Sequence, residues 1–576
     1  MIGPMLLVFA ISTAPCAPIA SLPAFRANQA DYQAGLPIDL VVGRTPKGSF
    51  PTGAWTLKEA DRGKVVATGV FAAAHGWNAL HDSAVVVSLP SSLPGGTYGL
   101  ESGKTRLGNF RVSATTDRQL FRTTMKAFYH NRSGSGTSFE FAGSWARPAG
   151  HPDTLVKRHS STGQNGTLSS PKGWYDAGDY GKYIVNSGIT CWTLLDLAES
   201  HPAVFDTLSW PIPAGSEPPL LCEARWNLDW MLSMQDADGG VYHKLTTLKF
   251  DAMTEQPHQD LADRYVVMKT TAATLDFASV FFKASRVFAK RDSAYAARCA
   301  SAAERAWAWS VAHPATVYHQ PPDVKTGKYE DTVLTDERLL AAVERRIQGG
   351  DDNFWMPFRG LLDQSRNEAS WQDVGALALY AILAHPRIFA KDTAIASARL
   401  LERARVLRDR SATTAYGVSI DSSEFVWGSN AVLANQGIHL LQAFRRSGDS
   451  GFLAAARRDL GYLLGANPFD SSFVTGVGLR PARHPHHRPS AADTVLEPVP
   501  GFLVGGGHLG GQDAGANPWQ CKDYRVGGAP ALSWTDQQCS YATNEVAINW
   551  NAALVGLVGG FIALRECPGG CYSVGR

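Results

Sequence analysis

The chain has 576 residues, which is more than one hydrophobic core usually holds. Its composition, 44% hydrophobic and 18% charged residues, is that of an ordinary globular protein and excludes a disordered or fibrous one. A formal net charge of +2 gives no electrostatic reason to expect nucleic acid as a partner. We therefore expect either two domains or one large barrel with an appendage.

The N-terminus carries the pattern of an exported protein. An apolar stretch from Met5 to Ile11 is followed by small residues at 12–14, where a signal peptidase would cut, although no Lys or Arg precedes the stretch. We expect residues 1–20 to be a signal peptide and the protein to be secreted or periplasmic. No later segment approaches the run of about 20 apolar residues that a membrane helix needs, so we expect no membrane association.

Eight cysteines are too few for a disulfide scaffold in a chain of this length. Cys521 and Cys539 bracket a loop, and a bridge between them is plausible in an exported protein. The spacing of the cysteines matches no common zinc pattern.

Residues 22–114 alternate between apolar and polar side chains, as short β-strands do. The strand candidates are "IDLVVG", "AWTLKEA", "KVVATGVF", "SAVVVSL", "TYGLES" and "NFRVSA", separated by Gly, Pro, Asn and Asp. Several strands in so short a stretch predict a small all-β sandwich, which we interpret as an immunoglobulin-like module.

Residues 119–566 follow a helical period instead. Apolar or small residues recur at alternating steps of four and three, as in the run from Ile184 to Ala198. Further helices are expected near 220–235, 273–287, 292–312, 334–347, 371–385, 430–446, 451–464 and 545–565. Long loops, notably 467–540, separate some of them, and loops of that length are usually functional. With almost no strand signal, this pattern predicts an all-α toroid whose helix pairs surround a central cleft.

The stretch "GWYDAGDYGKY" places Asp176 and Asp179 among the glycines Gly173, Gly178 and Gly181. Glycine permits unusual backbone angles and close approach of neighbouring groups. One aspartate could cap the helix that follows. The second is unexplained by capping, and two nearby carboxylates can hold a water for general-base chemistry.

A second cluster, "WTDQQCSYATNEVAINWNAAL", contains Trp534, Asp536, Tyr541, Glu545 and Trp550. Thr543 or Asn544 could cap a helix here, and Glu545 could do no more than favour the helix dipole. The density of polar and aromatic groups around Glu545 favours a functional role instead.

The third cluster, "SFVTGVGLRPARHPHHRPS", contains His484, His486, His487 and Arg488. Adjacent histidines rarely point at one metal ion, so a polar loop that meets a ligand is the better interpretation. The guanidinium of Arg488 would supply fixed donors.

Taken together, the three clusters resemble the signatures of glycoside hydrolase family 9, a family of inverting cellulases and related enzymes with an (α/α)6-barrel catalytic domain. The resemblance covers about residues 120–565, and the preceding β-module resembles the immunoglobulin-like domain of one branch of the family. It implies Asp179 as general base, Asp176 as its partner in holding water, and Glu545 as general acid. His486 and Asp536 are carried over as further catalytic residues, Asp536 orienting an active-site group, and substrate binding is expected of Arg488, Tyr541, Trp550 and Trp174.

The resemblance implies no cofactor for the chemistry. Many members with this β-module carry a structural zinc, but Ser133 and Gly150 stand where ligands would be expected, leaving His151 nearly alone, so we expect no zinc. Structural calcium is common in the family, and the candidate ligands are Asp236, Asp238 and Asp260, with a role as turn residues the equal alternative.

The preferred function is endo-acting hydrolysis of β-1,4-glucosidic bonds in cellulose or a related soluble β-glucan by a monomer. An exo-acting β-glucosidase or exo-β-glucosaminidase that releases one residue from a chain end is the alternative. A non-enzymatic alternative is a protein that binds carbohydrate without hydrolysing it. The presence of every acid and base position argues against this alternative.

Overall fold

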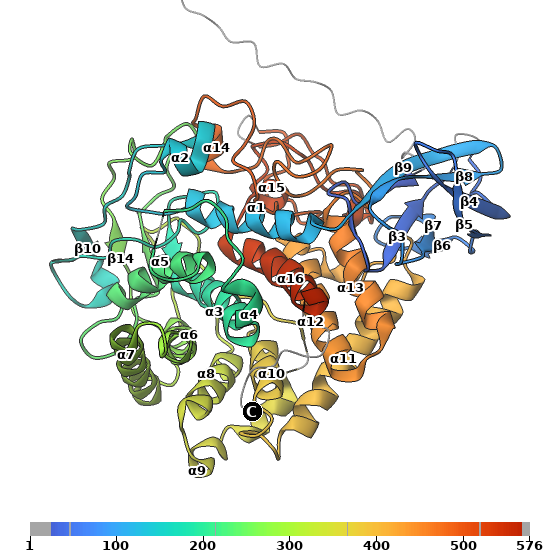
Figure 1. Cartoon of the computed structure of the whole chain (residues 1–576). Coiled ribbons are helices and arrows are strands. Elements are labelled where there is room, and N and C mark those ends of the chain that lie inside the picture. The colour runs from blue at the N-terminus through green and yellow to red at the C-terminus, as the bar shows by residue number, and fades with distance from the viewer. Residues whose placement is uncertain (1–24, 45–47, 214, 366, 518–519, 567–576) are drawn as a thin grey trace, which may run out of the picture.

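The computed structural model describes residues 25–44, 48–213, 215–365, 367–517 and 520–566, and Figure 1 shows their arrangement. The expected signal peptide at residues 1–20 lies outside the described residues. A β-module formed by the first strands lies at one edge of a larger helical body.

The β-module is a sandwich of two sheets. Their strand orders are β1-β3-β7-β6 and β2-β9-β8-β4-β5, and every neighbouring pair is antiparallel except β2 and β9. Alternate residues, such as Leu57, Leu100 and Val85, are buried in its core. The strands are β1 Phe25–Arg26, β2 Tyr32–Gln33, β3 Ile38–Val42, β4 Ala54–Glu59, β5 Val65–Val70, β6 His75–Trp77, β7 Asp82–Leu89, β8 Gly96–Ser102 and β9 Thr105–Ser113. The predicted strand candidates all correspond to observed strands.

The helical body contains the expected helices, with ends that differ from the predicted ones by a few residues. These are α3 Ile184–Ser200, α5 Pro219–Ser233, α6 Thr271–Phe288, α7 Ser293–Ala312, α8 Thr335–Gln348, α10 Gly375–Ala384, α12 Ser429–Ser447, α13 Ser450–Leu463 and α16 Ile548–Glu566. Two long helices were not predicted, α1 Thr116–His130 and α11 Thr393–Thr413. Five arginines interrupt the apolar pattern of α11, whose buried stripe is narrow.

Short elements connect the long helices. The short helices are α2 Phe139–Ala142, α4 Pro202–Phe205, α9 Asp352–Trp355, α14 Arg488–Ala491 and α15 Tyr541–Asn544. Five short strands form a mixed sheet in the order β11-β10-β14-β13-β12, which corrects the expectation of almost no strands in this region. They are β10 Val156–Arg158, β11 Thr167–Leu168, β12 Lys182–Tyr183, β13 Lys244–Thr246 and β14 Tyr265–Val266. Strand β12 directly follows the two aspartates and so anchors their loop.

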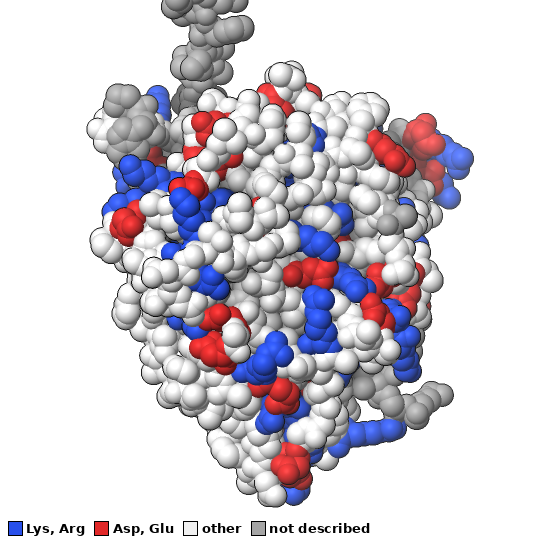
Figure 2. Space-filling view, turned by 90° about the vertical axis from the view of Figure 1, so that its left-hand side faces the viewer, with Lys and Arg blue, Asp and Glu red and all other residues white. Residues whose placement is uncertain are grey.

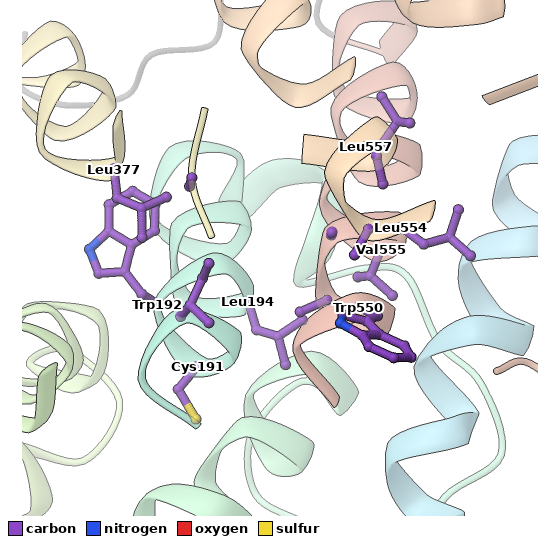
Figure 3. Close-up of a cluster of buried hydrophobic side chains, with 14 of the residues drawn as sticks. Cys191, Trp192, Leu194, Leu377, Trp550, Leu554, Val555 and Leu557 are labelled. Carbon is purple, nitrogen blue, oxygen red and sulfur yellow. The ribbon is translucent and has the colours of Figure 1, made fainter. Parts of the chain in front are cut away.

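Helix α16 lies at the centre of the helical body. Figure 3 shows Trp550, Leu554, Val555 and Leu557 of this helix in one apolar cluster with Trp192 and Leu194 of α3. Glycine permits the close packing, since a Cβ on Gly559 would lie 2.9 Å from a methyl group of Leu197. Among the described helices only α16 is long and apolar enough to span a membrane, contrary to expectation, but 89% of its most apolar window is buried inside the protein. That burial is typical of a core helix.

The β-module shares this core. The ring of Trp77 in β6 packs against Tyr416, Phe425 and Tyr462, with centroid distances of 5.7 to 6.2 Å. Arg26 donates to the carbonyl oxygens of Asn467 and Pro468 from the same side. The module is therefore packed onto the helical body, not tethered to it by a linker.

Charges are distributed evenly over the surface visible in Figure 2. Lysine and arginine side chains alternate there with aspartate and glutamate, and no large area of one sign is present on that face. This mixture agrees with the small net charge of the sequence.

Candidate active site

The three predicted clusters meet in the fold. His486 pairs with Glu545 in a parallel bridge, and its N–H donates to Asn544 O at 2.8 Å. The N–H of Ile548 donates to Asp176 O at 2.8 Å. Backbone hydrogen bonds thus join the aspartate loop, the histidine loop and the segment between α15 and α16 into one rigid frame.

Gly178, between the two aspartates, is the tightest point of this frame. A Cβ at this position would lie 2.1 Å from the backbone oxygen of His486, so no other residue fits without a shift. The carbonyl of Gly178 accepts from the backbone and guanidinium of Arg488 at 3.1 and 2.8 Å. A backbone hydrogen bond also joins Gly178 to the carboxyl group of Glu545.

Asp176 is completely buried. Its carboxyl oxygens accept from the Asn186 amide at 2.9 and 3.0 Å and from the Tyr329 hydroxyl at 2.8 Å. Burial, together with the neighbouring charge of Asp179, raises the pKa of Asp176 to about 8 despite these donors. Asp176 is therefore held in place from several sides and keeps its proton near neutral pH.

Asp179 is 5% exposed and has fewer partners. One oxygen accepts from the Gly181 N–H at 3.1 Å and, more weakly, from the Tyr183 hydroxyl at 3.4 Å. The capping hypothesis is wrong for both aspartates, because the residue that precedes α3 is Tyr183 and no side chain caps that helix. Asp179 is thus the more accessible acceptor of the pair.

Glu545 lies in an extended segment between α15 and α16, with φ −69° and ψ 161°. It stands three residues before α16, so the hypothesis that it serves the dipole of that helix is wrong. Asn544 is the last residue of α15 and Ser540 caps that short helix, so neither Thr543 nor Asn544 is a cap. Burial first, then the charges of Asp179 and Asp176, raise the pKa of Glu545 well above its ordinary value.

His486 is held in one tautomer. Its Nδ1 lies 2.7 Å from the carbonyl oxygen of Gln538, which can only accept, so Nδ1 carries the hydrogen and Nε2 is left as an acceptor. Burial lowers the pKa of His486 to about 4, and the ring is neutral. The Tyr541 ring stands edge-on at 6.0 Å.

Two predicted residues hold the frame through contacts with the backbone. All three donor nitrogens of Arg488 bond to backbone oxygens, those of Asp251 and Gly178, and the residue is 5% exposed. Asp536 accepts from the N–H groups of Arg483 and His484 at 2.8 and 2.9 Å and from the Asn544 amide. Asp536 thus orients the histidine loop, as expected of an orienting group, whereas Arg488 uses three of its five N–H donors on backbone oxygens.

The two predicted tryptophans lie in the interior. Trp174 is 0% exposed, donates to Glu223 at 2.9 Å and packs on Phe128, so its assignment to substrate binding is wrong. Trp550 is 9% exposed and lies beneath Gly428, where a Cβ would stand 2.6 Å from the indole. Its indole packs against the segment that contains Gly428.

Sequence reasoning missed three rings of this region, one bonded to a carboxylate and two packed against other rings of the site. Tyr329, which bonds to Asp176, has a left-handed φ of 49° and stacks edge-on with Trp371 at 5.0 Å. On the Glu545 side, Trp427 is 42% exposed and lies 5.3 Å from the Tyr541 ring. Backbone strain at a non-glycine residue, as at Tyr329, is common at functional sites. Such strain leaves no local signal in the sequence, and neither does a contact between residues about 150 positions apart.

The sequence-predicted calcium ligands are engaged otherwise. The ammonium of Lys269 lies 2.8 Å from Asp236 and 2.6 Å from Asp238, so a cation of the protein already neutralises this pair. Burial acts to raise the pKa of Asp236, but hydrogen bonds from Lys269 and Gln164 outweigh it and lower the pKa to about 2. Asp260 bonds to His151 at 2.8 Å. These three aspartates do not form a calcium site.

A different group of buried acids was missed. Asp276, Asp331, Asp336 and Glu337 each have a buried carboxyl oxygen without a hydrogen-bond partner. Burial, and then their mutual repulsion, raises the pKa of Asp276 and Glu337 well above the ordinary value. Within the described ranges no group of three or more His, Cys, Asp or Glu has the geometry to hold a metal ion. The oxygen-only donor set nevertheless fits a hard cation such as calcium.

The position expected for zinc does not fit that metal. A Cβ on Gly150 would lie 2.3 Å from the backbone of Pro257, which leaves no room for a cysteine. Both ring nitrogens of His151 are engaged, with Tyr175 and Asp260 at 2.8 Å each. Ser133 offers a hydroxyl and no thiolate.

The loop behind Tyr541 is closed by a disulfide between Cys521 and Cys539, as the sequence suggested. The bond ties the segment around Cys521 to Cys539, the residue that follows Gln538, the partner of His486. In the same loop Asp513 accepts from the N–H of Ala542 at 2.7 Å.

Comparison with known proteins gives consistent matches. Residues 118–558 match the family described as glycosyl hydrolase family 9. The chain is 38% identical, over 79% of its length and 80% of the relative's, to the xyloglucan-specific endo-beta-1,4-glucanase BoGH9A of Bacteroides ovatus. It is 32% identical to endoglucanase D of Acetivibrio thermocellus over 81% of this chain and 73% of that one.

Solved structures agree over more of the chain. A Bacteroides ovatus GH9 structure covers 94% of this chain and 99% of its own, with a TM-score of 0.84 at 33% identity. A thermostable endoglucanase from Alicyclobacillus acidocaldarius covers 93% of this chain and 99% of its own, with a TM-score of 0.83 at 31% identity.

Proposed function

The chain belongs to glycosyl hydrolase family 9, and from that premise we propose that it is an endo-acting β-1,4-glucanase that hydrolyses with inversion at the anomeric carbon. The observation that carries this proposal is the meeting of Glu545 with the Asp176–Asp179 loop through Gly178. One carboxyl that keeps its proton and one accessible carboxylate are the groups an inverting hydrolase needs.

Asp179 is the general base in this mechanism. It takes a proton from the water that attacks the anomeric carbon, while Asp176, fixed by Asn186 and Tyr329, keeps Asp179 and the water in place. Glu545 gives its proton to the leaving glycosidic oxygen. In inverting enzymes the acid and base stand about 6.5–9.5 Å apart so that water fits between base and sugar.

Aromatic rings on both sides of the carboxylates support endo action. Trp427 packs on Tyr541, which neighbours Glu545, and Trp371 packs on Tyr329, which bonds to Asp176. Rings of this kind stack on pyranose faces, so a glucan chain would be held on either side of the scissile bond. The two relatives named above are an endo-beta-1,4-glucanase and an endoglucanase, and one is described as xyloglucan-specific. Cellulose, xyloglucan and related soluble β-glucans are therefore the substrates to test.

The wider organisation is part of the same proposal. The helices of residues 119–566 would form an (α/α)6 toroid, preceded by an immunoglobulin-like module at 22–114 and a signal peptide at 1–20. Export to the periplasm or the medium fits the disulfide between Cys521 and Cys539, which persists in oxidising compartments. The mixed surface charge fits a monomer that acts on a neutral glycan, without nucleic acid or membrane as partner.

Metal would have a structural role only. We expect calcium to bind among Asp276, Asp331, Asp336 and Glu337, whose unpaired oxygens it would satisfy. No zinc is expected at Ser133, Gly150 and His151. The proton transfers involve the carboxyl groups alone.

The product profile tests the function. Cellohexaose, the matching chitosan oligomer and xyloglucan are incubated with the protein and with a Glu545→Gln variant. Mixed shorter oligomers from cellohexaose or xyloglucan, absent with the variant, are expected. Glucose or glucosamine as the sole early product would instead mean exo action, and identical products from the variant would show that Glu545 is not the acid.

A further inference from the structure

A cavity apart from the catalytic carboxylates is bordered by the residues that follow Arg488 in the chain. It has a volume of about 240 Å³ and is lined by residues that include His130, Trp145, Gln256, His258, Asp493 and Val499. Pro489 of α14, a helix labelled in Figure 1, is one of the lining residues. None of Asp176, Asp179 and Glu545 contributes to its lining.

Gln256 gives this cavity an unused acceptor. The residue is 7% exposed, and its amide nitrogen donates to Pro489 O at 2.9 Å. Its Oε1, although buried, has no hydrogen-bond partner. A buried amide oxygen without a partner is costly to the protein, so a turn of this side chain toward a ligand hydroxyl in the cavity would be favourable.

Trp145 gives the cavity a fixed aromatic wall. Its indole N–H donates to Glu497 O at 2.9 Å, which holds the ring against the segment that carries Asp493. The His130 ring stands perpendicular to it, with centroids 6.5 Å apart. A tryptophan anchored at its polar end is suited to stack on the apolar face of a pyranose.

The charges in the lining favour a neutral ligand. The Arg147 guanidinium donates to the carbonyl oxygens of His130 and Arg132 at 3.0 and 2.7 Å and is already satisfied. Burial lowers the pKa of His130 to about 3, so that ring is neutral. Asp493 accepts from the N–H of Val495 at 2.9 Å, which leaves capacity for a hydroxyl donor.

We propose that this cavity is a second, non-catalytic binding site for a pyranose unit of a neutral glycan. Trp145 stacks on the sugar ring, while Gln256 and Asp493 accept from its hydroxyl groups. The volume is slightly below that of sites for drug-sized ligands, about 300–1,000 Å³, and suits one or two sugar rings. The choice of a β-glucan as the ligand rests on the proposed function.

The test is a titration of the full-length Glu545→Gln variant, labelled with 5-fluorotryptophan, with cellotetraose, followed by ¹⁹F NMR. Trp145→Phe and Trp427→Phe identify the two resonances. The Trp145 resonance is expected to shift saturably, and to do so equally in a Trp427→Ala background. Gln256→Leu and, separately, Asp493→Asn should weaken the response at Trp145 at least fivefold while leaving that at Trp427 unchanged.

Phe139→Ala is the matched control, since Phe139 is 75% exposed on nearby α2 and does not line the cavity. Two results would overturn the proposal: no shift at Trp145 at millimolar cellotetraose, or a shift that disappears with Trp427→Ala. Hydrolysis of cellotetraose by the wild-type chain is measured in parallel. Its absence would count against the proposed catalytic function without affecting the titration of Trp145.

Discussion

Gly178 and His486 touch backbone to backbone at the centre of the site. The carbonyl oxygen of His486 lies 2.1 Å from the position that a Cβ on Gly178 would occupy. This contact places the loop that carries both aspartates against the His486 loop, which pairs with Glu545. The geometry of acid and base therefore depends on the absence of a single methyl group.

Gly178→Ala should consequently separate the two loops. A misplacement of about 1 Å in a catalytic group can cost about 10²-fold in rate, and we expect kcat to fall by at least that factor. The measurement is kcat on cellohexaose, with circular dichroism to check the fold. Gly527→Ala is the control, because no atom lies within 4 Å of its added Cβ. Equal rates for both variants would contradict the importance of the contact.

Glu545→Gln removes the proton that the leaving oxygen needs. General acid catalysis contributes about 10²–10⁴-fold, and kcat on cellohexaose should fall within that range. With a dinitrophenyl cellobioside, whose leaving group needs little protonation, the loss should be far smaller. Glu402→Gln, on the exposed side of α11, serves as the control. A similar loss on both substrates would argue against the assignment as acid.

The raised pKa of Glu545 sets the alkaline limit of activity. As pH rises through that pKa, Glu545 loses its proton and kcat/KM should fall. In Glu545→Gln this alkaline limb should be missing from the residual activity. An unchanged limb in the variant would assign it to another group.

Asp176 should make stability depend on pH. Its pKa is about 8 in the folded chain, against about 3.9 in an unfolded one. Between these values the folded state holds a proton that the unfolded state has lost, so this contribution is complete below about pH 4 and is lost as pH rises toward 8. The Tm of Asp176→Asn minus that of wild type should therefore increase from pH 5 to pH 8. A constant difference would contradict the raised pKa.

Calcium should stabilise the protein through the buried acids. Added calcium is expected to raise Tm of the wild type, and a chelator to reverse this, because binding to the folded state alone adds stability. Glu337→Gln should abolish the response. Asp238→Asn, which alters the pair held by Lys269, should keep it. A response that survives in Glu337→Gln, or is absent in wild type, would place the ion elsewhere or exclude it.

Trp427→Ala should weaken binding of longer substrates. Loss of a stacking ring costs about 0.5–1.5 kcal/mol beyond buried area, which corresponds to a rise of KM for cellohexaose by about 2- to 13-fold. Trp174→Phe should act on stability instead, because Glu223 loses its indole donor. If Trp174→Phe raised KM as much as Trp427→Ala, the placement of Trp174 in the core would be wrong.

Local sequence patterns predicted the structural features that are determined by residues close together in the chain. The strands of the β-module and the helices follow from periodicity, and three short motifs identified Asp176, Asp179 and Glu545. Residue pairs that meet only in the fold left no such trace. The motif position of Trp174 suggested a ligand, yet the indole donates to the buried Glu223, whereas Trp427 lies in no recognised motif and packs against Tyr541 of the site.

Partners distant in sequence also explain the errors about charge. Asp236 and Asp238 have the spacing of oxygen ligands, but Lys269, about thirty residues later, occupies the place of a cation. The acids around Asp276 and Glu337 come from segments about sixty residues apart and gather only through helix packing. The spacing of acidic residues along the chain predicts a set of metal ligands only when the neighbours of those residues in the fold are also known.

The Trp77 ring packs against Tyr416, Phe425 and Tyr462, and this packing limits how the protein can be divided into fragments. Phe425 stands two residues before Trp427, so the β-module packs against the segment that carries the Trp427 ring. A catalytic fragment that begins at residue 119 would lose part of its own interior along with the module. The two parts are best regarded as one folding unit, and exchange of the module between relatives would have to carry the matching residues around Phe425 with it.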